Sequence, residues 1–421
     1  MNSIVEALIN DSMHKWGLTN YTLHKHTILQ EVNAINETKY VSCTEWLPKG
    51  VDGVKVKEDD VYPEGVATIE LDIHEQTFTR VNFTGGISFS DQSYSFSNQT
   101  EVIKWVEELT GLIFQKSFMH ERKKEHSYTF KSCIDEIPTY PGGLIQVEWN
   151  EQNQLTLFSK QGVFVDQAIT KKEMDFLQVE DVYDLFEQQV DRYAIPNFDQ
   201  QVINEVYMIE ELFVRHDLKK TYPYSLLERP YVQVNKPLIW MKAGERKMVR
   251  TEYSMSREVS IKTALENEES IDAQPITKSS QLRVMEVVAE YVSSFYPNDS
   301  GKWMLSFMFR EWGLLQVVVR PVENGVKGYQ SKLVFMIDPR DFEVLNILDT
   351  TDFATMYESF KKPRNRKVHK EEAVHALWEH MTLEPYYVYD EQEEHFVLCG
   401  KLDCKKVVLV NCGAVIDENE V

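Results

Sequence analysis

The chain has 421 residues, of which 43% are hydrophobic and 12% aromatic, so its length fits about two to four folding units with packed cores. Lys and Arg number 45 and Asp and Glu 67, which gives a net charge of -22 and argues against nucleic acid or an anionic membrane surface as a partner. The first eleven residues lack the basic start of a signal peptide, and no run reaches the ~18 apolar residues of a membrane span. We therefore expect a cytoplasmic protein, with its five cysteines as reduced thiols.

The first stretch predicts one helix, two long strands and a hairpin. Apolar residues recur at helical spacing from Ile4 to Trp16, and Gly17 ends the pattern. Aromatic and β-branched residues, which favour strands, then follow at Tyr21–Val32, Lys39–Trp46, Val66–Ile73 and Phe78–Phe83.

The same order is predicted twice more before residue 254. Asn98-Gln99-Thr100-Glu101 and Thr170-Lys171-Lys172-Glu173 each resemble a capping box that opens a helix. Strands are expected after them at Tyr128–Ile134, Leu144–Trp149, Leu155–Phe158, Gln201–Val214 and Tyr231–Met241, with a further hairpin in Leu238–Val249.

Residues 254–280 contain no aromatic side chain and many Glu, Ser, Lys and Asp, so we interpret them as the main linker. A helix is expected from Ser280 to Pro297 and another around Val374–Met381. Strands are expected at Trp303–Phe309, Leu314–Val319, Leu333–Ile337, Phe342–Leu348, Pro385–Tyr389, Phe396–Leu402 and Val407–Val410.

The recurring order of helix and hairpin predicts an α+β fold of tandem units, each with one helix packed on an antiparallel sheet. The apolar residues that flank the hairpin turns are equally spaced in four places, namely Ile73 to Phe78, Ala243 to Met248, Ile337 to Phe342 and Leu402 to Val407. The predicted division is repeat unit 1 at 1–95, unit 2 at 96–168, unit 3 at 169–253, the linker at 254–280, unit 4 at 281–362 and unit 5 at 363–421.

Two similar seven-residue stretches support a duplication. Ser42-Cys43-Thr44-Glu45-Trp46-Leu47-Pro48 is matched by Ser132-Cys133-Ile134-Asp135-Glu136-Ile137-Pro138. If both are strands, Cys43 and Cys133 each share a face with an acidic residue. A carboxylate raises the pKa of a neighbouring thiol, so we interpret both cysteines as buried apolar residues rather than nucleophiles.

The hairpins carry a resemblance to a known family. The segment Lys332–Val344, and in kind Glu70-Leu71-Asp72 to Phe78, resembles PepSY-type modules, and most closely the tandem YcdB/YcdC-type repeats of Bacillus-like bacteria. The resemblance implies a cystatin-like helix-on-sheet unit and a binding or inhibitory role. It implies no established catalytic residues.

Other reactive residues form no recognisable centre. Cys399, Cys404 and Cys412 with His395 do not match the paired spacing of zinc ligands. The pair His24 and His26, and the pair His375 and His380, lack carboxylates at ligand spacing. Hence we predict no catalytic, cofactor-binding or metal-binding residues and no cofactor.

Two segments of the chain are strongly charged, one basic and one acidic. Lys361-Lys362-Pro363-Arg364-Asn365-Arg366-Lys367 suits either a solvated loop or a site for an acidic partner. Asp390–Glu394 is expected to be a hairpin turn or a loop.

The leading functional hypothesis is a non-enzymatic protein of several modules that binds or inhibits a peptide or protein partner, for example by strand addition at a sheet edge. The first alternative is a hydrolase with a single site where two units meet. The second is a structural or spore-associated protein. The sequence leaves the oligomeric state open.

Overall fold

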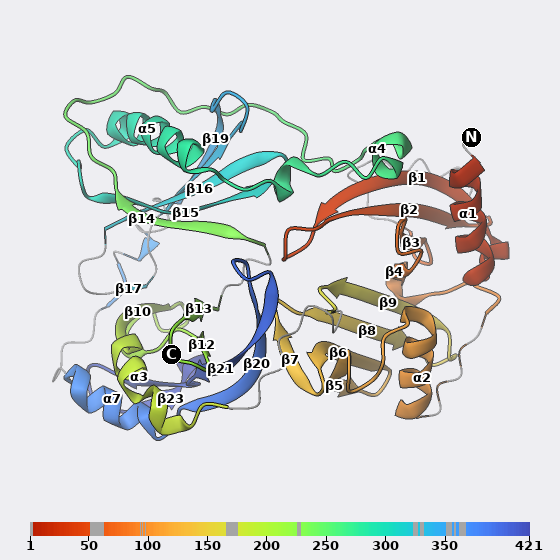
Figure 1. The fold of residues 1–421 in the computed structure, drawn as a ribbon, viewed down its shortest axis with the longest axis horizontal. Helices are drawn as coiled ribbons and strands as arrows, with labels where there is room; N and C mark the ends of the chain where they lie inside the picture. Colours follow the sequence, from red (N-terminus) through yellow and green to blue (C-terminus); the bar gives the residue numbers. More distant parts are fainter. Residues whose placement is uncertain are drawn as a thin grey trace. The chain divides into compact units, whose positions relative to one another are not determined.

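The computed structural model describes residues 3–50, 63–92, 94, 96, 98–165, 176–224, 229–322, 327–328, 332–350, 356–357, 359–361 and 368–421. The chain divides into two compact units, each assembled from separate segments. Unit 1 consists of Met1–Lys172, Ser256–Ala273 and Tyr387–Val397, and unit 2 of Glu173–Met255, Gln274–Tyr386 and Leu398–Val421. Strands dominate and helices are few (Figure 1), so the α+β class is confirmed.

Among its described residues, unit 1 contains two helices of three or more turns and a twisted antiparallel sheet. Its helices are α1 (Ser3–Lys15) and α2 (Gln99–Thr110), and a short helix, α4 (Ile261–Leu265), comes from the second segment. The strands are β1 (Tyr21–Val32), β2 (Thr38–Pro48), β3 (Ala67–Asp72), β4 (Phe78–Phe83), β5 (Phe118–Lys124), β6 (Ser127–Ile134), β7 (Ile137–Tyr140), β8 (Gly143–Trp149) and β9 (Leu155–Gly162).

The sheet of unit 1 has the neighbour order β1-β2-β3-β4-β9-β8-β6, and both β5 and β7 pair with β6. Along β8, side chains alternate between buried and less buried positions, as expected for a strand with one face on a core. The buried side chains of both helices, such as Leu8 of α1 and Val106 of α2, join one hydrophobic cluster with Ile69 and Phe158 of the sheet.

Part of the predicted linker 254–280 packs on unit 1. Ala264 is fully buried in the unit 1 cluster, and Val259 and Ile261 pack against it. The backbone N–H of Gln30 donates to Arg257 O, and that of Val259 donates to Ile28 O. This segment therefore extends the edge of β1.

The described part of unit 2 contains two five-stranded sheets and three helices of at least seven residues. The helices are α3 (Tyr183–Gln189), α5 (Lys278–Phe295) and α7 (Lys370–Trp378). The strands wholly in unit 2 are β10 (Asp191–Asn197), β11 (Val202–Met208), β12 (Leu212–Arg215), β13 (Thr221–Pro223), β14 (Tyr231–Pro237), β15 (Trp303–Glu311), β16 (Leu314–Pro321), β17 (Lys327–Gly328), β18 (Leu333–Ile337), β19 (Val344–Asp349), β22 (Lys406–Leu409) and β23 (Val415–Asp417). Two further strands, β20 (Thr382–Asp390) and β21 (His395–Asp403), have residues in both units.

Helix α5 and the sheet β14-β15-β16-β18-β19 share one core. Val284, Val288 and Val292 recur along α5 at helical spacing and are buried against strand residues such as Leu315 and Phe335. The second sheet has the order β17-β10-β11-β22-β23. Helices α3 and α7 pack together beside it, with the rings of Phe186 and Trp378 5.2 Å apart.

Two of the four predicted hairpins are wrong. Residues 238–249 form no strand, so Ala243 and Met248 do not flank a turn between paired strands. The other error is at Leu402 and Val407, because β21 pairs with β12 whereas β22 pairs with β11 and β23. Equal spacing of apolar residues identified buried positions at Leu402 and Val407 without identifying strand partners, whereas Ala243 and Met248 are exposed.

The structural equivalence of the two seven-residue stretches is also wrong. Ser42–Pro48 lies within the continuous strand β2. In Ser132–Pro138, by contrast, β6 ends at Ile134, and Asp135 and Glu136 adopt φ values of 48° and 70° before β7 begins. Two consecutive residues at positive φ reverse the chain, so Cys133 lies opposite Pro138 across a turn and does not share a strand face with Asp135.

Candidate functional site

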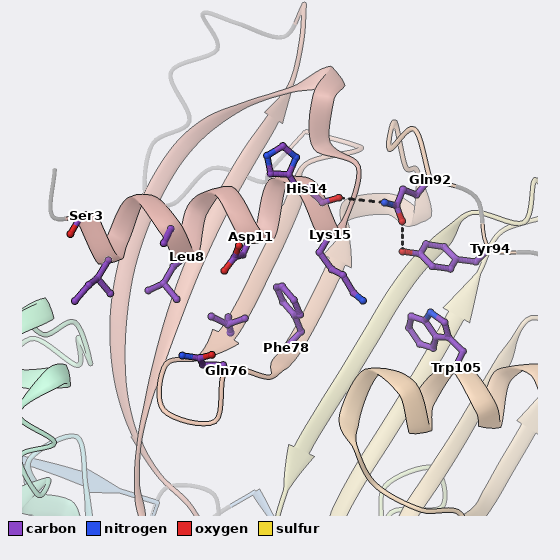
Figure 2. Close-up of a pocket in the computed structure, with 13 residues that line it drawn as sticks. Ser3, Leu8, Asp11, His14, Lys15, Gln76, Phe78, Gln92, Tyr94 and Trp105 are labelled. Atoms are coloured by element: carbon purple, nitrogen blue, oxygen red, sulfur yellow. Dashed lines mark hydrogen bonds between the residues drawn. The ribbon is translucent and has the colours of Figure 1, made fainter.

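A cleft of about 870 Å³ lies in unit 1, between α1 on one side and the β3–β4 turn and α2 on the other (Figure 2). It is bordered by α1, by the ends of two strands, by the segment before α2 and by α2 itself. The lining residues are Ser3, Ile4, Ala7, Leu8, Asp11, His14, Lys15, Leu71, Gln76, Phe78, Gln92, Tyr94 and Trp105. Segments far apart in the sequence therefore build one site.

Helical spacing explains the wall that α1 contributes. Ile4, Ala7, Leu8, Asp11 and Lys15 follow the spacing of three or four residues that places side chains on one side of a helix. Leu8 is buried, whereas Ile4 and Ala7 are exposed at the cleft. The wall is aliphatic toward the start of α1 and charged toward its end.

Aromatic side chains form the opposite wall. The ring of Trp105 lies 5.6 Å from that of Tyr94 and 6.5 Å from that of Trp16, and the rings of Trp16 and Phe78 lie 5.3 Å apart edge to face. Such contacts stabilise aromatic clusters beyond the burial of their area. Trp105 also meets Phe158 of the sheet, so the aromatic wall is anchored in the core.

Gln92 ties the end of α1 to this aromatic cluster. Its side-chain amide donates to His14 O at 3.4 Å and its carbonyl accepts from the hydroxyl of Tyr94 at 3.0 Å (Figure 2). Burial raises the pKa of Tyr94 to about 12, so this hydroxyl stays protonated and remains a donor at neutral pH.

Two opposite charges are available at the cleft. Asp11 and Lys15 are exposed, and both extend from the side of α1 that faces Phe78 (Figure 2). Neither side chain has a hydrogen-bond or ion-pair partner among the described residues. The His14 ring points to the other side of α1. His14 therefore contributes to the cleft through its backbone oxygen, which accepts the hydrogen bond from Gln92.

The predicted burial of Cys43 and Cys133 is confirmed. They are 8% and 0% exposed, and burial, followed by neighbouring carboxylates, raises the pKa of Cys43 to about 12. Burial likewise raises the pKa of Cys133 to about 11. Neither thiol lines the cleft, and neither has the thiolate character that a nucleophile requires.

The remaining cysteines do not converge. Cys399 and Cys404 are buried, Cys412 is exposed, and all five cysteines are free thiols. Within the described ranges, no group of three or more His, Cys, Asp or Glu side chains is arranged to hold a metal ion.

The histidines singled out in the sequence lie outside the cleft. His24, His375 and His380 are exposed. His26 lies 3.0 Å from the hydroxyl of Ser42 through Nε2, and burial lowers the pKa of His26. Ser42 is only 3% exposed, and the described part of the chain supplies no carboxylate to orient His26. The pair therefore lacks the access and the third group of an activated serine.

Of the two charged segments, residues 362–367 of the basic one lie outside the described residues. Residues 391–394 form the turn between β20 and β21, so the prediction for Asp390–Glu394 is confirmed.

No family model matches the chain, and no curated protein matches it in sequence. Among solved structures, the chain is similar to the Bacillus megaterium YpeB C-terminal domain, with 7% identity, a TM-score of 0.24, and coverage of 83% of this chain and 97% of the other. A similarity this low carries no argument about fold or function. Among the described residues, no helix is long and apolar enough to cross a membrane.

Sequence reasoning missed the cleft completely. The one sequence signal of the cleft is the stripe of apolar residues along α1, and the same stripe is expected of any helix that packs one face on a core. The convergence of Asp11, Gln76 and Trp105 depends on how strands and helices pack, which the order of residues alone does not reveal.

Proposed function

We propose that this chain is a non-enzymatic binding protein whose unit 1 cleft receives an apolar part of a peptide or protein partner. The observation that carries the proposal is the cleft itself. Its volume of about 870 Å³ falls in the ~300–1,000 Å³ range of ligand sites, which are mostly apolar with a few polar groups that orient the ligand. Ile4, Leu71 and Phe78 supply the apolar surface, and Asp11 and Lys15 the polar groups.

A modular construction is part of this proposal. Helix α1 precedes β1-β2-β3-β4, α2 precedes β5-β6-β8-β9, and α5 precedes β15-β16-β18-β19, in each case with neighbouring strands paired. This recurring order supports tandem units of helix and antiparallel sheet, related to PepSY-type modules of the YcdB/YcdC kind. The segment Lys332–Val344, which carries the resemblance, contains β18 and the turn that leads into its paired strand β19.

The cleft can be tested with the fluorescent apolar dye anilinonaphthalene sulfonate. We expect saturable binding of one dye per chain, and we expect Ala7→Trp to abolish it, because the indole fills the cleft. Asn10→Trp places the same side chain on an exposed position of α1 that does not line the cleft, so it serves as the matched control. Equal dye binding by the two variants would show that the cleft is not the binding site.

A further inference from the structure

The polar groups of the cleft have a regular spacing along α1. The aliphatic group around Ala7 is followed one turn later by Asp11, and Asp11 one turn later by Lys15. At ~1.5 Å per residue, each step is about 6 Å along the helix axis. The cleft thus presents an apolar, an acidic and a basic site in a row.

This spacing matches an extended peptide. Side chains two residues apart in a strand point to the same side and lie about 6.6 Å apart. Three alternate residues of such a peptide therefore reach the three sites in turn. Over this distance the difference between about 12 Å on α1 and about 13 Å on the peptide is small enough for flexible side chains to absorb.

The wall opposite α1 is suited to such a ligand. Gln76 is exposed at the cleft and its side-chain amide has no hydrogen-bond partner among the described residues, so it is available to a peptide backbone. Phe78 and the half-buried Trp105 line the same cleft as Asp11 and Lys15, so the aliphatic stem of a bound lysine can pack on aromatic surface there.

We propose that the cleft binds an extended peptide segment with an apolar residue, a basic residue two positions later and an acidic residue two positions after that. The apolar residue contacts Ile4, Ala7 and Leu8, the basic residue pairs with Asp11, and the acidic residue pairs with Lys15. The inference rests on the proposed function and adds the ligand's chemistry and its direction along α1.

The test uses two blocked peptides of identical composition, acetyl-Ala-Leu-Ala-Lys-Ala-Glu-Ala-amide and its charge-exchanged isomer acetyl-Ala-Leu-Ala-Glu-Ala-Lys-Ala-amide. In calorimetric titrations of the full chain at low salt, we expect the first to bind about threefold to tenfold more tightly. Two exposed ion pairs of modest strength are replaced by two like-charge contacts in the isomer. The leucine fixes the orientation, because only one end of the cleft wall on α1 is aliphatic.

Exchange of the two charges on the protein should reverse this preference. The variant Asp11→Lys/Lys15→Asp keeps the net charge and is expected to bind the second peptide more tightly. The matched control is Lys104→Glu/Glu108→Lys on α2, an exposed pair at the same helical spacing that does not line the cleft. It should keep the original preference. Circular dichroism checks that both variants fold. The single neutral changes Asp11→Asn and Lys15→Gln should each reduce the ratio of the two peptide affinities to half its original value or less.

Equal affinity for the two isomers, or a preference that the double exchange does not move, would overturn the inference. If neither peptide binds while the dye still occupies the cleft, the ligand chemistry is wrong and the proposed function stands. If the dye also fails to bind, the proposed function itself is wrong.

Discussion

At Cys43 and Cys133, burial determines the chemistry of the side chain. Both thiols lie among strand residues, and their pKa values of about 12 and about 11 lie well above the ordinary value near 8.5. Desolvation disfavours the thiolate, and the nearby Glu70 and Glu45 carboxylates add repulsion at Cys43. At pH 8 the neutral thiol therefore predominates at both positions.

Thiol labelling with Ellman's reagent at pH 8 should consequently be fast at one site. We expect Cys412, which is exposed, to react first, and the four buried cysteines, Cys43, Cys133, Cys399 and Cys404, to react only slowly until denaturant is added. Cys412→Ser should remove the fast phase. Rapid labelling of Cys43 or Cys133 in the native protein would contradict the burial described above.

Glu211 illustrates how an ion cluster links stability to pH. Burial alone would raise its pKa, but hydrogen bonds and attraction from Lys401 and Lys405 outweigh burial and lower it. The Lys401 ammonium lies 2.7 Å from Glu211 and 3.4 Å from Asp403. A carboxyl whose pKa is lowered by folding stabilises the protein above its unfolded pKa, and this contribution disappears as the pH falls through the folded pKa.

We therefore expect Glu211→Gln to lower the free energy of unfolding by about 1 kcal/mol at pH 7, the upper end for a partly exposed pair. The difference from the parent protein should shrink as the pH falls below the unfolded value of about 4.3, and it should disappear once the pH is below the lowered pKa of the folded carboxyl, where the parent is protonated in both states. Urea denaturation of both proteins at a series of pH values measures this difference in the free energy of unfolding. A difference that stays constant down to pH 3 would show that lost packing, not charge, causes the effect.

Among the elements, α2 begins where its sequence indicates. The side chain of Asn98 accepts a hydrogen bond from the backbone N–H of Glu101 at 3.1 Å, which confirms that part of the predicted capping box. The cap satisfies one of the free N–H groups at the helix start.

Replacement of this cap should destabilise unit 1 modestly. We expect Asn98→Ala to lower the free energy of unfolding by about 1 kcal/mol, whereas Asn98→Ser, which retains an acceptor without placing a charge beside Glu101, should lower it less. Chemical denaturation followed by circular dichroism compares the two. An equal loss in both variants would mean that the amide group matters for another reason.

A substitution in the turn between β6 and β7 is expected to stabilise the protein. Asp135 and Glu136 both adopt positive φ, a conformation that costs non-glycine residues about 1 kcal/mol or more. Glu136→Gly should therefore raise the free energy of unfolding by several tenths of a kcal/mol up to about 1, after the greater flexibility of glycine in the unfolded chain is offset.

Glu136→Ala is the control, since alanine shares the unfavourable φ and should not stabilise the protein. Thermal melts of both variants decide the matter. A stabilising alanine would indicate that the gain comes from removal of the exposed carboxylate.

Sequence patterns predicted elements better than their partners. Strands with strong alternation or aromatic content, such as Tyr21–Val32 and Phe78–Phe83, coincide with β1 and β4. Strand β5 was missed because most of its residues after His120 are charged and exposed, so it has no apolar alternation. The turn at Asp135 was missed because it contains no glycine or asparagine, the residues that usually mark positive φ.

At the scale of the whole molecule, unit 1 is completed by residues remote from its first segment. The backbone N–H of Gln30 donates to Arg257 O and that of Val259 donates to Ile28 O, and Ala264 fills the same core. A continuous fragment of the first segment lacks these contacts.

We expect the fragment 1–172 to unfold at a lower urea concentration than unit 1 in the full chain. A synthetic peptide of residues 256–273, added or fused through a flexible linker, should raise the midpoint, because ligands of the folded state stabilise it by mass action. A scrambled peptide is the control. Identical midpoints with and without the peptide would contradict a stabilising role for this segment.

The division of unit 1 into three separate segments also bears on how the chain acquires its structure during synthesis. Domains of a growing chain generally fold in the order in which they leave the ribosome. Here the first 172 residues emerge together, yet the last residues of the same unit, Tyr387–Val397, follow after most of unit 2. The edge of β1 near Ile28 has no backbone partner from residues 257–259 until those are translated, so the nascent chain presents an unpaired strand edge for much of its synthesis.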